Sequence, residues 1–270
     1  MVTRYWTGHI PSMAYPPLKE TIMLKGKTAL ITGSTSGIGK AIAERLAEEG
    51  CNIVLNGFGD PGEIDTLKRS IAAEHSVMVG YSSADLTRIP AIENMMAYVQ
   101  NEFGGADILV NNAGMQHVSP IEAFPVDKWN LIIALNLSAA FHTIRLAMPG
   151  MKEKGWGRII ALTSASVKQP MPRHALSSIF RAGVHVALKH LVEEVSVHGV
   201  TVNAIAPATV ITPTFAAYHN LERRVSEIPL KRPGTGDELG GTVAFLASNY
   251  AGFITGETIQ FDGGMTRALF

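Results

Sequence analysis

The segment KTALITGSTSGIG, residues 27–39, gives the strongest indication of the fold of this chain. It opens with a short apolar segment, KTALIT, and then apolar residues recur at helical spacing. Gly33, Gly37 and Gly39 lie where strand becomes helix. Glycines at such a junction permit a tight turn and bring backbone amides and a helix N-terminus up to a pyrophosphate. The stretch therefore predicts a dinucleotide-binding βαβ unit.

Strands and helices alternate from Lys27 to the end of the chain. The expected strands are short, apolar on both faces and mostly β-branched: 27–32, 52–56, 77–81, 107–111, 158–162, 201–206 and 258–261. Between them lie amphipathic stretches, such as the one with Val184, Leu188, Leu191 and Val195 at helical spacing. The alternation predicts an α/β fold with a doubly wound parallel sheet, a Rossmann fold, in a single domain.

The N-terminal residues 1–22 do not fit this alternation. They contain three prolines, show no clear period and lack the continuous apolar core of a signal peptide. We expect a loosely ordered extension here and a complete domain over residues 23–270.

Composition excludes several classes of function. The 270 residues carry 23 basic and 23 acidic side chains, so net charge provides no attraction for nucleic acid or an anionic membrane. No uninterrupted apolar run approaches the roughly 20 residues of a membrane helix. Cys51 is the only cysteine, which excludes an intrachain disulfide and favours a reducing, cytoplasmic location. We expect no metal site and no macromolecular partner other than further copies of the chain.

The motifs TGSTSGIG (32–39) and NNAG (111–114) resemble those of the short-chain dehydrogenase/reductase family, and the resemblance covers residues 23–270. It implies a nicotinamide-dependent oxidoreductase that acts on a small alcohol or carbonyl compound. It also implies the residues that hold the cofactor: Gly33, Ser36, Gly37, Ile38, Gly39, Phe58, Asp85, Leu86, Asn112, Ala113, Gly114, Arg181, Pro207, Val210 and Thr212. Ala208 stands where the family usually has a glycine.

The residues after the second strand favour NAD over NADP. An NADP site needs a cation at the 2′-phosphate, but NGFGD (56–60) contains no Arg or Lys, and residue 36 is a serine. Lys40 is expected to face solvent. Asn56 or Asp60 would lie near the ribose hydroxyls.

The catalytic set of the family is an Asn, a Ser, a Tyr and a Lys, and this chain departs from it. Asn136 and Ser164 match the first two. In HALSSIFRAGV (174–184), however, Ser177 falls at the Tyr position and Arg181 at the Lys position. A serine hydroxyl is far less acidic than a phenol, and a guanidinium stays charged and relays no proton. The standard mechanism therefore cannot run unchanged.

The first half of the chain also resembles bacterial D-3-hydroxybutyrate dehydrogenases, through LNGFGD (55–60), NNAGMQH (111–117) and KWNLIIALNLSAAFH (128–142). This resemblance implies a substrate-binding role for Gln116 and a homotetramer. In that group a His and a Lys also hold the substrate carboxylate, and here their positions are Ser166 and His174.

Two hypotheses follow from the altered catalytic set. The first is an active NAD-dependent enzyme with a rebuilt proton relay, for which His174, His117 and Lys168 are the candidate bases. His174 is preferred because its position faces the substrate in the family and its ordinary pKa suits neutral pH. The second is a non-catalytic NAD(H)-binding paralogue, either a sensor or an inactive subunit.

Overall fold

The computed structural model describes residues 24–212 and 221–269, and the predicted extension (1–22) lies outside them. Seven parallel strands form one sheet in the order β3-β2-β1-β4-β5-β6-β7. The strands are β1 (Thr28–Ile31), β2 (Asn52–Asn56), β3 (Val79–Ser82), β4 (Ile108–Asn111), β5 (Gly157–Leu162), β6 (Val200–Pro207) and β7 (Thr258–Phe261). The main helices are α1 (Gly37–Glu48), α2 (Pro61–His75), α3 (Ile89–Phe103), α4 (Val126–Ile133), α5 (Ala139–Lys154), α6 (Ala175–Val195), α8 (Leu221–Glu227) and α9 (Gly236–Ala247).

The predicted Rossmann fold is confirmed, and each expected strand is present within two residues of its expected bounds. Strand order reverses between β1 and β4, so the carboxyl ends of these strands open a crevice in which ligands bind in folds of this kind.

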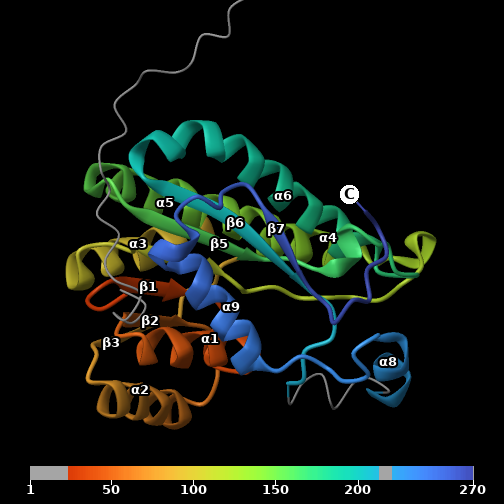
Figure 1. Ribbon diagram of the computed structural model, residues 1–270, viewed down its shortest axis with the longest axis horizontal. Coiled ribbons are helices and arrows are strands. Elements are labelled where there is room, and N and C mark those ends of the chain that lie inside the picture. Colours follow the sequence, from red (N-terminus) through yellow and green to blue (C-terminus); the bar gives the residue numbers. More distant parts are fainter. Residues whose placement is uncertain (1–23, 213–220, 270) are drawn as a thin grey trace, which may run out of the picture.

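Helices cover both faces of the sheet. Helices α1, α2 and α9 lie on one side, and α3, α5 and α6 lie on the other (Figure 1). Each layer encloses its own cluster of fully buried side chains, the first centred on Ile31, Ile42 and Leu46, the second on Leu30, Leu109 and Ile159. Alternate residues of a strand thus enter opposite cores, which explains why these strands are apolar throughout.

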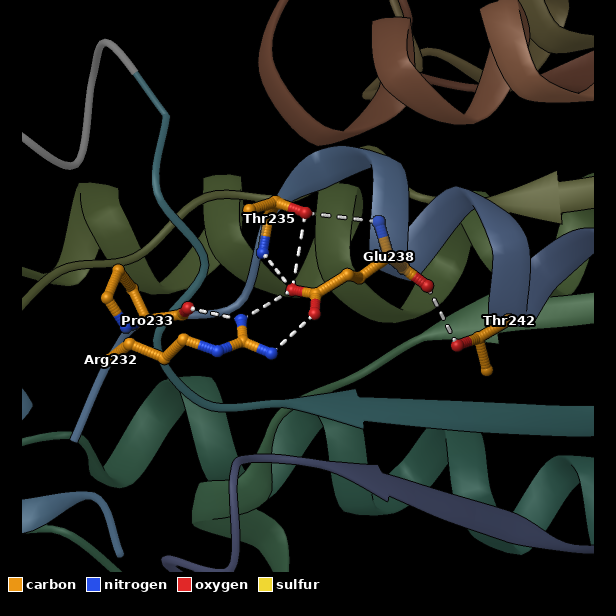
Figure 2. Close-up of polar contacts among 5 residues, drawn as sticks. All are labelled: Arg232, Pro233, Thr235, Glu238 and Thr242. Carbon is orange, nitrogen blue, oxygen red and sulfur yellow. Dashed lines mark hydrogen bonds and ion pairs between the residues drawn. The ribbon is translucent and has the colours of Figure 1, made fainter. Parts of the chain in front are cut away.

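Helix α1, which follows the glycine turn after β1, packs mainly against α9. A capping box begins α9, because Thr235 Oγ1 accepts from the Glu238 amide at 3.1 Å and Glu238 Oε2 accepts from the Thr235 amide at 3.0 Å. Arg232 donates to both carboxylate oxygens of Glu238, as Figure 2 shows. Several charged hydrogen bonds therefore fix the first turn of α9, the helix that packs against α1.

One continuous helical stretch, Val126–Lys154, is long and apolar enough by composition to cross a membrane. Its buried residues in α5, however, belong to the core against the sheet, among them Ile144, Ala147 and Met151. The core thus accounts for part of its apolar character, while Val126, Trp129 and Phe141 on the same stretch are exposed. Midway the helix widens into a π-helical turn, η2 (Ala134–Ser138), which contains Asn136.

Cys51 directly precedes β2 and is fully buried. Burial, with smaller contributions from Glu49 and Asp107, raises the pKa of its thiol to about 12. The thiol is a small core group without thiolate reactivity at neutral pH.

Candidate functional site

A cavity of about 700 Å³ opens at the carboxyl ends of the central strands. It extends from the glycine-rich turn after β1, past the ends of β2 and β4, to the start of α6. It contains most of the predicted site residues: Gly33, Ser36, Gly37, Ile38, Gly39, Phe58, Asp85, Leu86, Asn112, Ala113, Gly114, Gln116, Ser164, Ser177, Arg181, Pro207 and Thr212.

Two glycines of the turn, Gly33 and Gly39, have no room for a side chain. A Cβ on Gly39 would lie 2.2 Å from the carbonyl oxygen of Gly33, and one on Gly33 would lie 3.0 Å from Cα of Ala113. Gly33 and Gly37 also adopt positive φ angles, +62° and +55°. The backbone thus forms the wall of the cavity itself, and the amides at the start of α1 are available to an anion.

Asn112 and Thr32 hold this wall in place. Asn112 Nδ2 donates to the carbonyl oxygens of Thr32 and Gly33, both at 2.9 Å. In return Thr32 Oγ1 accepts from the amides of Asn112 and Ala113, both at 3.0 Å. These bonds tie the end of β4 to the glycine turn.

The two candidates for the ribose end are in different positions. Asn56 lines the cavity, and its Nδ2 donates to the carbonyl oxygens of Ser82 and Ala84, both at 3.1 Å. Asp60 instead caps α2, because its carboxylate accepts from the amides of Gly62 and Glu63. Of the two candidates for the ribose hydroxyls, Asn56 lines the cavity and Asp60 does not.

Asp85, one of the residues predicted to hold the cofactor, lines the cavity beside Thr87. Its Oδ1 accepts from the Thr87 hydroxyl at 2.7 Å and from the Thr87 amide at 3.0 Å. These two hydrogen bonds hold the pKa of the Asp85 carboxyl below its ordinary value. The group is therefore an ionised acceptor at neutral pH.

Ser177 and Arg181 meet at the other end of the cavity. Arg181 Nη1 donates to Ser177 Oγ across one turn of α6. Burial lowers the pKa of Arg181 to about 10, so its guanidinium is still charged at neutral pH. A Cβ on Gly114 would lie 3.0 Å from Arg181 Nη2, so the glycine of NNAG leaves the room that this guanidinium occupies.

Ser164 begins a chain of hydroxyl groups. Its Oγ lies 2.9 Å from Ser166 Oγ, and Ser178 Oγ donates to Ser166 Oγ at 2.9 Å. The chain ends at the carbonyl oxygen of His174, which lies 3.2 Å from Ser178 Oγ and is the alternative acceptor for its hydroxyl proton. Ser164 can donate a hydrogen bond to a substrate oxygen. The hydroxyl chain behind it, however, ends at a backbone carbonyl oxygen, which does not take up the substrate proton.

Asn136 lies beside the cavity rather than in its wall. Its amide pairs with the backbone of Met115, accepting from the amide and donating to the carbonyl oxygen, both at 2.9 Å. Asn136 therefore fixes the segment after NNAG, and it shares a small adjoining cavity with Arg181.

Four further candidates do not line the main cavity among the described residues. Val210 is buried in the core. His174 is buried, and its Nδ1 lies 2.8 Å from the carbonyl oxygen of Pro172. His117 packs edge-on against Phe124, and Lys168 lies at the end of a short turn after Ser164. The structure thus places the preferred candidate base, His174, and the second histidine, His117, outside the wall of the main cavity.

Sequence reasoning missed several residues of the cavity wall. One of them is Thr163, directly before Ser164 at the end of β5. Its position beside a candidate catalytic serine was the available signal. Other missed residues are Thr35, Gly57, Ala84, Thr87, Leu131, Leu135 and Leu162.

The residues present fit a nicotinamide dinucleotide. Closely packed glycines adjoin a helix N-terminus at one end, and a guanidinium with two serine hydroxyls lies at the other. When bound, such a cofactor supplies a hydride acceptor or donor. Over residues 24–212 and 221–269, no three His, Cys, Asp or Glu side chains are grouped to hold a metal ion.

Comparison with known proteins agrees with this geometry. A family model described as enoyl-(acyl carrier protein) reductase matches residues 33–266. D-beta-hydroxybutyrate dehydrogenase of Cupriavidus necator is 45% identical over 90% of this chain and 98% of its own length. The chain belongs to the short-chain dehydrogenase/reductase family.

Other members of the family support the same assignment. D-beta-hydroxybutyrate dehydrogenase of Rhizobium meliloti is 46% identical over 89% of this chain and 98% of its own length. The crystal structure of L-sorbose reductase from Gluconobacter frateurii, complexed with NADPH and L-sorbose, is 32% identical and covers 93% of this chain and 100% of that one, with a TM-score of 0.87. The chain is accordingly a short-chain oxidoreductase of the kind that acts on CH–OH groups.

Proposed function

We propose that this short-chain dehydrogenase is NAD-dependent and interconverts a small alcohol and its carbonyl compound through a non-standard proton relay. The observation that carries the proposal is one cavity that joins the glycine turn to Ser164, Ser177 and Arg181. Ser164 donates a hydrogen bond to the reacting oxygen. Arg181 holds the cofactor by donating to its ribose hydroxyls.

The preference for NAD rests on the charge of the cavity wall. Arg181 is the only basic residue among the described residues that line it, and it lies at the catalytic end. The wall near Asn56 and Phe58 therefore offers no cation to a 2′-phosphate. Calorimetric titration should find NADH bound more tightly than NADPH, and the reverse order would refute the assignment.

The substrate is predicted to differ from 3-hydroxybutyrate, and turnover of that acid is expected to be absent or very weak. Of the residues compared with the carboxylate-binding set, Gln116 lines the cavity, whereas Ser166 and His174 do not. Neither replacement supplies a fixed positive charge near pH 7. In addition, Ser177 has no phenol to accept the proton.

A screen of alcohols and ketones that follows NADH absorbance tests the proposed function. Turnover that is lost in Ser164→Ala, with NADH affinity retained, supports it. The competing hypothesis, a non-catalytic NAD(H)-binding paralogue, is supported instead if NADH binds tightly and no substrate is turned over.

We further propose a cytoplasmic homotetramer with no nucleic-acid or membrane partner. The homotetramer is suggested by exposed apolar side chains on the outer helices, including Phe141 on α5 and Ile179 and Val186 on α6. Light scattering that reports a monomer at micromolar concentration would contradict it.

A further inference from the structure

A second chain of polar groups begins at the cavity wall, beside the first. Thr163 Oγ1 lies 2.7 Å from His185 Nε2, and His185 Nδ1 lies 3.3 Å from Thr258 Oγ1. Thr163 lines the cavity at the end of β5, His185 comes from α6 and Thr258 from β7. Unlike the serine chain, this one places a titratable side chain one hydrogen bond behind the cavity wall.

The position of His185 follows from the helix that carries the altered catalytic residues. Ser177, Arg181 and His185 are spaced four residues apart on α6 and therefore lie along one face. His185 lies one turn beyond the guanidinium. The same helix face thus presents a hydroxyl, a fixed cation and an imidazole in succession.

The surroundings of His185 favour its neutral form. Partial burial, and to a lesser degree the charge of Lys168, hold the pKa of its imidazole below the ordinary value of 6.5. The other charged groups near it are Arg181 and Lys189, one turn away on either side along α6, and Glu257, directly before β7, which is paired with Lys189 at 3.3 Å. No carboxylate among the described residues hydrogen-bonds to the ring, so nothing there stabilises the imidazolium.

The hydroxyl groups on either side permit both neutral tautomers. Thr163 Oγ1 also lies 3.1 Å from the carbonyl oxygen of Ile205. If the Thr163 hydroxyl donates to the Ile205 carbonyl oxygen, the His185 proton is on Nε2 and Nε2–H donates to Thr163. If Thr163 donates to Nε2 instead, His185 Nδ1–H donates to Thr258. The second arrangement leaves Nε2 ready to receive a proton from Thr163.

We propose that Thr163 and His185 form the proton relay that replaces the missing tyrosine, a proposal that rests on the oxidoreductase function above. In alcohol oxidation the substrate O–H proton passes to Thr163 Oγ1, directly or across one water. The proton of the Thr163 hydroxyl passes in the same step to His185 Nε2. The cofactor, which the glycine turn and Arg181 would hold, would supply the acceptor for the hydride that the substrate carbon loses as its C–O bond becomes a carbonyl. Reduction reverses each transfer.

A purely structural role is the competing explanation, because the same bonds tie α6 to β5 and β7. The two roles differ in their pH dependence. A relay through a neutral imidazole makes the oxidation rate fall as pH drops through the pKa of His185. A purely structural role predicts no fall in the oxidation rate at the pKa of His185.

Steady-state kinetics with matched variants separate these roles. His185→Gln and Thr163→Val should each lower kcat for alcohol oxidation about 10²-fold or more, and both should abolish the fall in kcat at low pH. Thr163→Ser keeps the hydroxyl and should keep most of the activity and the pH profile. His190→Gln, an exposed histidine on the same helix, is the control and should match the wild type.

A measurement on the cofactor-free protein gives a readout besides activity. With ¹³C-labelled histidine, the NMR signal that is absent from His185→Gln should titrate below pH 6.5. In Thr163→Val that signal should move, because its hydrogen-bond partner is lost. NADH affinity and the unfolding midpoint are measured in parallel to show that the variants are folded.

The outcomes distinguish this relay from the function on which it rests. An active wild type whose low-pH limb persists in His185→Gln overturns the relay alone, as does full activity of Thr163→Val. A His185 signal that titrates above pH 6.5 also overturns it. A wild type that turns over no alcohol or ketone overturns the proposed function, and the relay with it.

Discussion

Replacing Gly39 by alanine tests how tightly the cofactor turn is built. The added Cβ would lie 2.2 Å from the carbonyl oxygen of Gly33 and 2.5 Å from Asn112 Nδ2. These two atoms are the partners of one of the hydrogen bonds that clamp the turn, 2.9 Å long. The new methyl group therefore breaks the hydrogen bond from Asn112 to Gly33 and also clashes with the backbone.

The expected loss of stability can be estimated from these contacts. Overpacking costs about 1–3 kcal/mol, and an unsatisfied buried hydrogen-bonding group costs about 1–3 kcal/mol. Alanine favours a helix over glycine by only about 1 kcal/mol, so the clash decides the sign. We expect Gly39→Ala to lower the free energy of unfolding by about 1–5 kcal/mol and to weaken NADH binding at least about tenfold, equivalent to about 1.4 kcal/mol.

Urea denaturation followed by tryptophan fluorescence measures the stability, and a fluorescence titration measures NADH affinity. Gly241→Ala is the matched control, because Gly241 lies inside α9 with no atom within 4 Å of its added Cβ. That variant should be as stable as the wild type or more stable by about 0.5–1 kcal/mol. If Gly39→Ala behaved like Gly241→Ala in both assays, our account of the turn would be wrong.

Three further predictions concern other groups. The Cys51 thiol, with its pKa raised to about 12, should not react with a disulfide reagent at pH 8 until the protein is unfolded in denaturant, and rapid labelling of the native protein would contradict its burial. Ser177→Tyr combined with Arg181→Lys should raise 3-hydroxybutyrate oxidation more than the product of the single changes, because the pair acts as a unit, and simple additivity would count against this. Arg232 lowers the pKa of Glu238 to about 2, below its ordinary 4.5, so the stability that this carboxylate contributes is complete above pH 4.5 and lost as pH falls towards 2. Glu238→Gln should lose less stability between pH 5 and 2 than the wild type. An equal loss would show that the Glu238 carboxylate does not contribute to the pH dependence of stability.

The sheet could be predicted from the sequence because each strand is short, apolar and bounded by a turn. The glycine turn could be predicted for the same local reasons. The π-helical turn that contains Asn136 gives no such local signal, since its residues read as ordinary helix. The contact between Thr163 and His185 joins residues 22 positions apart, and only the packing of α6 on the sheet creates it. His174 was favoured by its sequence position, but its ring turns to the Pro172 carbonyl oxygen, a preference invisible in the sequence.

The division of labour along α6 explains how this site differs from a tyrosine–lysine pair. A lysine next to a tyrosine lowers the phenol pKa and also carries protons, whereas a guanidinium supplies only the charge. With Arg181 bonded to Ser177, this part of the site retains a fixed cation and lacks a proton carrier. Any carrier must therefore come from a neighbouring group that titrates near neutral pH and connects with the cavity. Among the described side chains, His185 is the group that we propose for this role, because burial holds the pKa of its imidazole below the ordinary 6.5 and the hydroxyl of Thr163 links it to the cavity. The tyrosine–lysine pair combines a positive charge with proton transfer. In our proposal these two roles are divided, with Arg181 supplying the charge and Thr163 and His185 transferring the proton one helical turn away.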